Sequence, residues 1–397
     1  MALPPNSSIG IIGGGQLGRM SALAAARLGY RCHILTPEPD SPASQVSAYT
    51  TLGDYEDPAA LQAFADAVDV ITFEFENVSA AGLDLLASLR DVHPSPTILR
   101  ISQDRVAEKS FLADAGVPTA PWRPVGSLAE LHEAVAALGL PAVLKTTRLG
   151  YDGKGQAVLR HADDLLPAWE ALEPKPLVLE GFVNYACEIS AIVARGADGA
   201  GSIYDVMENR HRGGILDLTL APARVAPATA TEAQRVAWRI ADRLGLVGLL
   251  TVEMFVRDGR VLVNEIAPRP HNSGHWTIDA CPCSQFEMHV RAVAGLPLPP
   301  GRRHADAVMK NLVGPEETAL WPEIVATPGL IPHLYGKAEA RPGRKMGHVN
   351  RLFPLGELPD DTTMRSALGC IAPSPVGKGS RPPHRIGQAC CHALRMR

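Results

Sequence analysis

Two apolar runs joined by an Asp-Gly turn constrain the fold of this chain more than any other feature. Val252 to Phe255 and Val261 to Val263 lie on either side of Asp258-Gly259. Asp-Gly between apolar runs is a strong β-hairpin signal. In such a hairpin Glu253 and Glu265 would lie on neighbouring antiparallel strands, where their carboxylates could face each other across one divalent cation. The alternative is a pair of ordinary surface acids.

The residues that follow the hairpin combine ligands for metals with ligands for anions. Residues 264–276 read Asn-Glu-Ile-Ala-Pro-Arg-Pro-His-Asn-Ser-Gly-His-Trp. Mg²⁺ prefers one or two carboxylates together with phosphate oxygens, and arginine pairs bidentately with carboxylate or phosphate. This order predicts a site where Mg²⁺ holds a nucleotide phosphate beside an anionic substrate. His271 and His275, taken singly, could each be structural.

Composition excludes several classes of protein. A chain of 397 residues is long enough for two or three domains with a large core. The net charge of −4 and the lack of a basic run interleaved with aromatic residues argue against nucleic-acid and membrane-surface partners. No run approaches the ~18 apolar residues of a membrane span, and residues 1–8 lack the pattern of a secretory signal. The seven scattered cysteines suit reduced thiols, so we expect a cytoplasmic protein.

The N-terminal region alternates strands with helices. Strands are expected at 9–12, 31–35 and 68–73, and helices at 16–28 and 58–67. This alternation predicts a parallel sheet with right-handed crossovers. Acids at the carboxyl ends of parallel strands line the ligand crevice, so Glu76 could hold a ribose hydroxyl. A helix N-cap cluster around Asn77 is a nearly equal alternative.

A glycine-rich segment joins the first strand to the first helix. Residues 13–18 read Gly-Gly-Gly-Gln-Leu-Gly, which fits the dinucleotide-binding template. That template also needs an acid at the end of the second strand, where this chain has Leu35-Thr36-Pro37 and only a late Glu38. NAD binding is therefore disfavoured. Binding of another phosphate and simple tight packing of strand on helix are equally good explanations.

The central region contains a second glycine-rich loop. Residues 150–156 read Gly-Tyr-Asp-Gly-Lys-Gly-Gln and follow an expected strand that ends at Lys145. The loop lacks the P-loop arrangement, but its glycines and Lys154 suit a lid over polyphosphate; an exposed turn is the alternative. Glu180 to Val183, after another strand, could hold an adenine and its ribose.

The other expected elements are a linker at 94–96, a helix at 103–115 capped by Ser102, strands at 141–145, 177–180 and within 187–206, and a helix at 231–244.

After residue 301 the chain reads as a small separate domain of short strands. A basic turn at 341–348, with Lys337 upstream, matters only if it folds over the site. From about Cys370 onward the chain is rich in Pro, Gly, Arg and Cys without apolar periodicity. That composition predicts disorder, and a short irregular cap is the alternative.

Together these motifs resemble the ATP-grasp superfamily, and within it the 5-(carboxyamino)imidazole ribonucleotide synthase family. The resemblance runs from Ile9 to about Arg351, and the segment from Cys370 departs from the family pattern. It rests on these blocks: GGGQLGRM at 13–20, FEFENV at 73–78, QDR at 103–105, APW at 120–122, GYDGKGQ at 150–156, NEIAPRPHNSGHWT at 264–277, SQFEMHVRA at 284–292 and RPGRKMGHVN at 341–350.

The resemblance implies an α/β and α+β chain with an ATP-grasp fold. A Rossmann-like pre-grasp domain would span 1–95, the ATP-grasp domain 96–300 with a small subdomain at about 120–182, and a small β-rich C-terminal domain 301–397 with an atypical tail from about 370. The implied reaction is the carboxylation of 5-aminoimidazole ribonucleotide with ATP and bicarbonate, assisted by Mg²⁺, in purine biosynthesis. A homodimer and a hand-off of product to the carboxyaminoimidazole ribonucleotide mutase are also implied.

The resemblance also assigns roles to individual residues. Magnesium would bind Glu253 and Glu265. The catalytic set would be Tyr151, Asp152, Arg269, His271, Asn272 and Lys345, with Asp152 and His271 both open as acceptor of the amine proton. The ribonucleotide would contact Gln16, Leu17, Glu76, Lys337 and Arg344. ATP would contact Arg105, Lys145, Gly150, Tyr151, Asp152, Gly153, Lys154, Gly155, Gln156, Glu180, Gly181, Phe182, Val183, Glu188, His211, Asn264 and Glu265.

Three other functions compete with this one. Another ATP-grasp ligase, such as a formate-dependent glycinamide ribonucleotide transformylase, would share the ATP and Mg²⁺ residues but differ in the acceptor pocket. A non-catalytic nucleotide sensor on the same fold would not need both metal acids and the full lid. An NAD-dependent oxidoreductase rests on the 13–18 segment alone.

Overall fold

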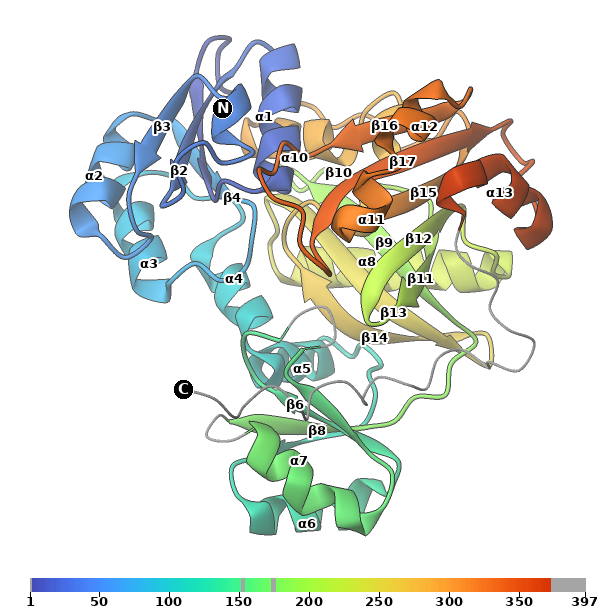
Figure 1. Ribbon diagram of the computed structural model, residues 1–397. Helices are drawn as coiled ribbons and strands as arrows, with labels where there is room; N and C mark the ends of the chain where they lie inside the picture. The colour runs from blue at the N-terminus through green and yellow to red at the C-terminus, as the bar shows by residue number, and fades with distance from the viewer. Residues whose placement is uncertain (1, 151–153, 173–175, 373–397) are drawn as a thin grey trace.

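The computed structural model describes residues 2–150, 154–172 and 176–372, which form three sheets (Figure 1). The N-terminal sheet is parallel, in the order β3-β2-β1-β4. Its strands are β1 (Ser8–Ile12), β2 (Arg31–Thr36), β3 (Tyr49–Leu52) and β4 (Val70–Phe73). The helices of this region are α1 (Gln16–Arg27), α2 (Pro58–Asp66) and α3 (Ala80–Leu89), with a short 3-10 helix η1 (Ser44–Val46). The predicted parallel βαβ arrangement is confirmed.

Strand β3 was not predicted from the sequence. It lies at the edge of the sheet, and its residues Tyr49 to Leu52 are exposed or only half-buried. An edge strand with little buried surface carries no apolar pattern, so the alternation used to find strands is missing here.

Two helices lead into the next sheet, where one was predicted. They are α4 (Pro96–Gln103) and α5 (Arg105–Asp114). The helix predicted at 103–115 corresponds to α5, but Ser102 is not its cap. Asp104 has an extended backbone, and its side chain accepts hydrogen bonds from the N–H groups of Val106 and Ala107 at 3.0 and 3.1 Å. Asp104 therefore ends one helix and caps the next.

The small sheet is antiparallel, in the order β5-β8-β6-β7, and lies at the bottom of Figure 1. Its strands are β5 (Trp122–Val125), β6 (Ala142–Thr146), β7 (Gln156–Leu159) and β8 (Leu177–Gly181). The accompanying helices are α6 (Leu128–Leu138), α7 (Leu165–Leu172) and η2 (Ala162–Asp164). Leu144, Leu179 and Trp169 belong to the apolar core between these helices and the sheet.

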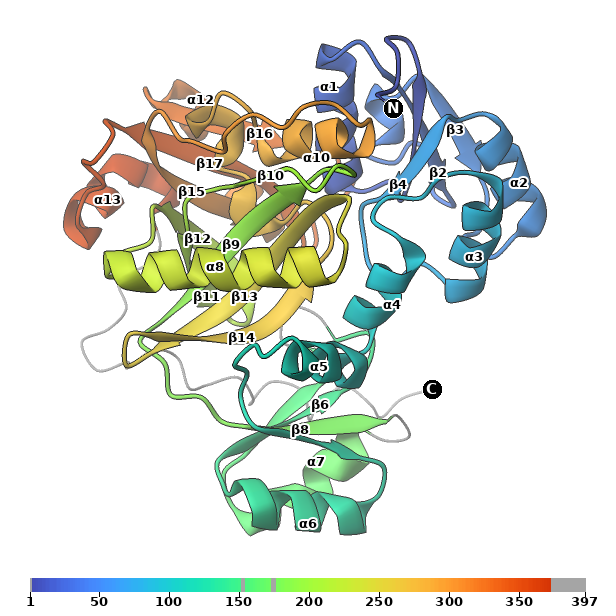
Figure 2. The same cartoon turned by 180° about the vertical axis from the view of Figure 1, so that it is seen from behind.

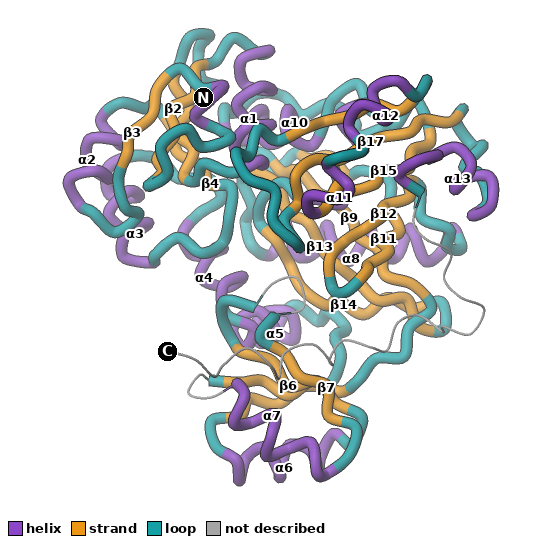
Figure 3. The backbone as a smooth tube through the Cα atoms, in the orientation of Figure 1, coloured by secondary structure: helices purple, strands orange, loops and turns teal. Residues whose placement is uncertain are grey.

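The large sheet has nine strands, in the order β14-β13-β9-β11-β12-β15-β17-β16 with β10 paired to β9 (Figure 3). Its strands are β9 (Cys187–Arg195), β10 (Gly201–Ile203), β11 (Met207–Arg212), β12 (Ile215–Ala221), β13 (Gly248–Arg257), β14 (Arg260–Ala267), β15 (Asp306–Val313), β16 (Leu330–Leu334) and β17 (Lys345–Phe353). The predicted hairpin is β13–β14, and Glu253 pairs with Glu265 in its register.

The C-terminal strands do not form a sheet of their own. The strands expected after residue 301 are present, but β15, β16 and β17 continue the large sheet through β12. The domain limits at 95 and 300 stay predictions. The tail from 373 lies outside the described residues, whereas Cys370 belongs to a 3-10 helix, η4 (Gly369–Ile371).

Two helices pack against strands β9 and β13 of the large sheet. α8 (Pro227–Arg243) crosses β9 and β13, and α10 (Gln285–Val293) packs on β13 and also on α1 (Figure 2). α10 therefore joins the N-terminal region to the large sheet. The remaining helices are η3 (Asn272–Gly274), α9 (Thr277–Ala280), α11 (Gly314–Thr318), α12 (Trp321–Ala326) and α13 (Asp361–Leu368). Among the described residues, no helix is long and apolar enough to cross a membrane.

Candidate active site

One cavity of about 1110 Å³ is lined by residues of the small and large sheets and by the segments that follow β1 and β4 of the N-terminal sheet. Most of the predicted site residues line it: Gln16, Leu17, Glu76, Arg105, Lys145, Gly150, Lys154, Gln156, Glu180, Gly181, Phe182, Val183, Glu188, His211, Glu253, Asn264, Glu265, Arg269, His271, Asn272 and Lys345. Among the described residues Gly155, Lys337 and Arg344 are not part of its wall. Tyr151, Asp152 and Gly153 lie outside the described residues.

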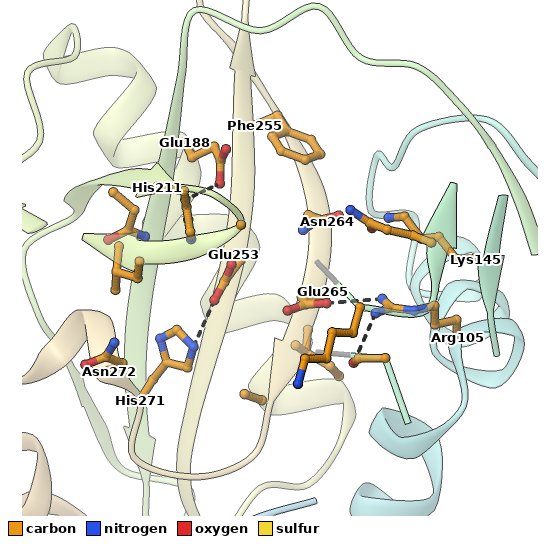
Figure 4. Close-up of a pocket in the computed structure, with 18 of the residues that line it drawn as sticks. Arg105, Lys145, Glu188, His211, Glu253, Phe255, Asn264, Glu265, His271 and Asn272 are labelled. Atoms are coloured by element: carbon orange, nitrogen blue, oxygen red, sulfur yellow. Dashed lines mark hydrogen bonds and ion pairs between the residues drawn. The ribbon is translucent and has the colours of Figure 1, made fainter. Parts of the chain in front are cut away.

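The two predicted metal ligands lie on the paired strands β13 and β14 (Figure 4). Glu253 Oε1 lies 2.9 Å from His271 Nε2, and Glu265 Oε2 lies 3.1 Å from a guanidinium nitrogen of Arg105. Burial alone would raise the pKa of Glu265, but the charges of Arg105 and Lys145 hold that pKa below its ordinary value. Glu265 therefore stays ionised, as a metal ligand must.

The residues around this pair fit a cation whose coordination shell is completed by phosphate oxygens. Asn264 Oδ1 and Asn272 Oδ1 are buried and have no hydrogen-bond partner among the described residues, and both asparagines line the cavity. Within the described part of the chain, no group of three or more His, Cys, Asp or Glu side chains is arranged to hold a metal by itself. Mg²⁺ does not need one, because one or two carboxylates suffice when substrate phosphates supply the other oxygens.

A buried cluster of charges lies opposite, on the small sheet and α5. Glu180 bridges two ammonium groups, with Oε2 3.0 Å from Lys145 Nζ and Oε1 3.2 Å from Lys109 Nζ. Although burial alone would raise the pKa of Glu180, Lys145 and Lys109 hold it at about 2. Burial lowers the pKa of Lys145, an effect that Glu180 opposes. Lys145 is thus held rigidly at the cavity wall.

A second acid lies on the large sheet, close to a pair of stacked aromatic rings. Glu188 Oε2 lies 3.0 Å from His211 Nδ1, and the hydroxyl of Tyr185 donates to Glu188 Oε1. Burial opposes protonation, but Glu188 raises the pKa of His211 above its ordinary value. The rings of Tyr185 and Phe255 stack with centroids 4.6 Å apart, and both line the cavity. These groups suit a planar heterocycle with polar edges.

Two further cations were predicted for the substrate and carboxylation site: Arg269 lines the cavity, and Lys337 does not. Arg269 pairs with Glu76 at 2.5 Å, and its buried Nε has no partner among the described residues. Lys337 donates to the backbone carbonyl of Lys345 at 2.7 Å, and burial lowers its pKa to about 8. A guanidinium with a free buried donor suits a small oxyanion.

The glycine-rich segment at the start of α1 is already occupied by an acid. Glu74, which is buried, accepts a hydrogen bond from the N–H of Gly18 at 2.6 Å and another from the N–H of Gly15. A Cβ on Gly15 would lie 2.5 Å from Glu74 Oε1, so glycine is needed there for this close approach. The side chain takes the place that a phosphate would have at a helix N-terminus. Of the open explanations, tight packing within the protein fits this segment best.

We predict that Glu74→Gln lowers the free energy of unfolding by about 1–3 kcal/mol, because one of the two backbone donors would face an amide NH₂ instead of an oxygen. Urea unfolding measures this change. Glu38→Gln, on an exposed side chain of the neighbouring loop, is the control and should leave stability within about 0.5 kcal/mol. Equal stability of both variants would contradict the capping role of Glu74.

Sequence reasoning missed Glu108, a buried acid behind Glu265. Glu108 Oε1 accepts from the N–H of Ile266 at 2.6 Å, and burial raises the pKa of Glu108 to about 8. It therefore anchors β14 directly beside the predicted metal ligand. One signal was available, since Glu108 lies three residues after Arg105 on α5 and so on the same helix face.

Comparisons with known proteins agree with this architecture. The family described as ATP-grasp domain matches residues 110–286, the ribonucleotide synthetase preATP-grasp domain matches 6–103, and the phosphoribosylaminoimidazole carboxylase C-terminal domain matches 307–354. The fold and the site thus define an ATP-grasp protein. An N5-carboxyaminoimidazole ribonucleotide synthase from Brucella melitensis is 50% identical over 356 residues, which cover 89% of this chain and 98% of that relative. The chain belongs to the N5-carboxyaminoimidazole ribonucleotide synthase family, which confirms the resemblance seen in its motifs.

Other relatives support the same assignment. The synthase from Pseudomonas aeruginosa is 46% identical, covering 86% of this chain and 93% of its own. The structure of the Staphylococcus aureus synthetase complexed with ADP superposes with a TM-score of 0.87 at 37% identity, covering 92% of this chain and 97% of that one. The Aspergillus clavatus synthase in complex with ADP and 5-aminoimidazole ribonucleotide gives a TM-score of 0.86 at 32% identity, covering 92% and 98%.

Proposed function

We propose that this protein carboxylates 5-aminoimidazole ribonucleotide with ATP and bicarbonate to give N5-carboxyaminoimidazole ribonucleotide. The observation that carries the proposal is the single cavity shared by the acid pair Glu253 and Glu265, the cations Arg105 and Lys145, and Arg269. Relatives named for this activity cover 89% and 86% of this chain. One of them has been seen with ADP and 5-aminoimidazole ribonucleotide together.

Glu253 and Glu265 would hold Mg²⁺, with oxygens of the ATP phosphates completing its shell. The bound ion would supply charge neutralisation for phosphoryl transfer. Lys145 would lie against the phosphates as a point charge, kept in place by Glu180. The stacked Tyr185 and Phe255 with Glu188 would receive the adenosine.

Bicarbonate is a poor electrophile and has to be activated. Its oxygen attacks the γ-phosphorus of ATP, the bond to the ADP oxygen breaks, and carboxyphosphate forms. Carboxyphosphate breaks down to CO₂ and phosphate, and the amine of the ribonucleotide attacks the CO₂ carbon and loses one proton. Preorganised charge supplies most of the catalysis in such transfers. Arg269 and Lys345 would hold the carboxyphosphate anion.

The amine proton has two candidate acceptors, of which Asp152 lies outside the described residues and His271 lies within them. The N–H of Ser273 donates to His271 Nδ1 at 3.3 Å, so in the neutral ring the proton is on Nε2. That Nε2–H points at Glu253 Oε1, 2.9 Å away. Both ring nitrogens of His271 are therefore in use. The role of the 150–156 loop as a lid stays a prediction from sequence.

The acceptor can be tested with ¹³C-labelled bicarbonate. We expect a new carbamate carbon resonance that requires ATP, Mg²⁺ and 5-aminoimidazole ribonucleotide together. Formate-dependent ADP release with glycinamide ribonucleotide, and none with bicarbonate, would instead support the transformylase.

A homodimer, a cytoplasmic location and transfer of the product to a mutase are further proposals from the family. Sedimentation of the purified protein tests whether it is a homodimer.

We predict that the KM for 5-aminoimidazole ribonucleotide rises above about pH 8 and is flat below it. Burial lowers the pKa of Lys337 to about 8, so this cation loses its charge above that pH and attracts the anionic ribonucleotide less. KM measured between about pH 6.5 and 9.5 checks this. In Lys337→Arg the guanidinium stays charged, and the rise should disappear. The same rise in both proteins would contradict a role for Lys337.

A further inference from the structure

Gln285 is a fully buried polar residue beside the site that the mechanism above does not use. It is the first residue of α10, and its exposed fraction is 0%. Its Oε1 accepts a hydrogen bond from the backbone N–H of His271 at 2.9 Å. Its Nε2 donates to the backbone carbonyl of His271 at 2.7 Å. One side-chain amide thus satisfies both backbone groups of a single site residue.

The orientation of this amide follows from its partners. A backbone N–H can only donate and a carbonyl can only accept, so the oxygen and nitrogen of Gln285 cannot be exchanged. The nitrogen also lies 3.1 Å from His275 Nδ1, which must therefore accept. No other residue type of this length carries a neutral acceptor and a donor in this fork.

The backbone of His271 decides where its imidazole lies. The ring caps η3, because its Nδ1 accepts from the N–H of Ser273. The other nitrogen reaches Glu253 at 2.9 Å. The imidazole is attached to the backbone through a single methylene group, so it follows any movement of the backbone. A displaced backbone would therefore move Nε2 away from Glu253.

Gln285 itself is well anchored. Its backbone N–H donates to Thr277 Oγ1 at 2.9 Å. Its neighbour Phe286 packs with Leu17 of α1 in a small apolar cluster. A Cβ on Gly274 would lie 2.5 Å from Gln285 Oε1, so a glycine there allows the amide to approach the loop. The amide is thus a rigid link between α10 and the loop at 271–274.

We infer that Gln285 is a positioning residue for the carboxylation reaction. It holds the backbone of His271 so that the imidazole meets Glu253 in the cavity. Gln285 does not line the cavity and acts only through His271. The inference rests on the proposed function for its kinetic part, and on the hydrogen bonds alone for its structural part.

A double-mutant cycle tests the kinetic part. Gln285→Met keeps the length of the side chain and removes both hydrogen bonds. We expect it to lower kcat for ribonucleotide-dependent ADP release by about 10- to 100-fold, because small misplacements of catalytic groups have effects of that size. In a protein that already carries His271→Ala, the same change should cost less than about threefold. If Gln285→Met lowered kcat by the same factor in the wild type and in His271→Ala, the inference would be overturned.

Two controls separate positioning from general damage. Gln234→Met removes a comparable amide that donates to the backbone carbonyl of Tyr204, away from the cavity, and should leave kcat within about twofold. ADP affinity should also stay within about twofold in Gln285→Met, because the expected nucleotide contacts are on other elements. A loss of ADP affinity that matches the loss of kcat would overturn the inference. If Gln285→Met does not fold, Gln285→Glu, which retains the acceptor for the His271 N–H, carries the same cycle.

A measurement without turnover distinguishes failure of this inference from failure of the proposed function. The ring ¹⁵N resonances of His271, assigned by their absence in His271→Ala, report which nitrogen carries the proton. We expect them to shift in Gln285→Met and to stay in place in Gln234→Met. Unchanged His271 resonances would overturn the positioning role even in an enzyme whose substrate proved to be different.

Discussion

Glu265→Gln is expected to lower kcat by about 10³-fold or more, since metal-assisted charge stabilisation is worth several kcal/mol and each 1.36 kcal/mol is a factor of ten. The change removes one of two carboxylates that face each other on β13 and β14. It also removes the charge that pairs with Arg105 at 3.1 Å. A neutral amide of the same shape keeps the packing of the strand but binds Mg²⁺ poorly.

Two comparisons make this prediction specific. Glu357→Gln, on an exposed side chain remote from the cavity, should have wild-type kcat. The melting temperature of Glu265→Gln should stay close to that of the wild type. Wild-type turnover in a folded Glu265→Gln protein would exclude Glu265 as a metal ligand.

Glu180→Gln is expected to lower the free energy of unfolding by about 3–5 kcal/mol, the usual cost of removing one partner of a buried charge pair. The exposed fractions of the side chains of Lys109 and Glu180 are only 1% and 5%. Without the carboxylate, the ammonium groups of Lys109 and Lys145 would lie buried side by side with no compensating charge. Urea unfolding measures the loss directly.

The matched control is Glu232→Gln on α8. Glu232 pairs with Arg235 at 2.7 Å, but its side chain is 39% exposed. Exposed pairs contribute about 0–1 kcal/mol, so the control should be nearly as stable as the wild type. Equal losses in the two variants would mean that the buried cluster adds nothing beyond a surface pair.

The same cluster gives a pH dependence. The pKa of Glu180 is depressed to about 2 in the folded protein, against an ordinary value of 4.5. A depressed carboxyl pKa contributes stability above the unfolded value, and this contribution is lost as the pH falls toward the folded value. The stability difference between wild type and Glu180→Gln should therefore shrink below about pH 4.5.

The local features of the site were predictable from the sequence because they depend on short-range patterns. The Asp258-Gly259 turn fixes the β13–β14 hairpin, and the hairpin register alone brings Glu253 opposite Glu265. The sequence motifs shared with the family then indicated which cations belong to the site. Even the break at Asp104 had a visible cause, since aspartate before a helical run is a common N-cap.

The supporting contacts were not predictable because they join segments far apart in the chain. Nothing near Glu74 in sequence shows that it caps α1, and nothing near Gln285 shows that it holds His271. Such pairs form only when the chain has folded and brought these segments together. The continuation of the large sheet into β15–β17 has the same origin, since strand patterns do not reveal which sheet a strand joins.

The most direct test of the function is ADP release by the purified full chain with Mg-ATP and bicarbonate, with and without 5-aminoimidazole ribonucleotide. We expect strong stimulation by the ribonucleotide in the wild type and none in Glu265→Gln. A folded wild-type protein whose ADP release does not respond to the ribonucleotide would contradict the proposed acceptor.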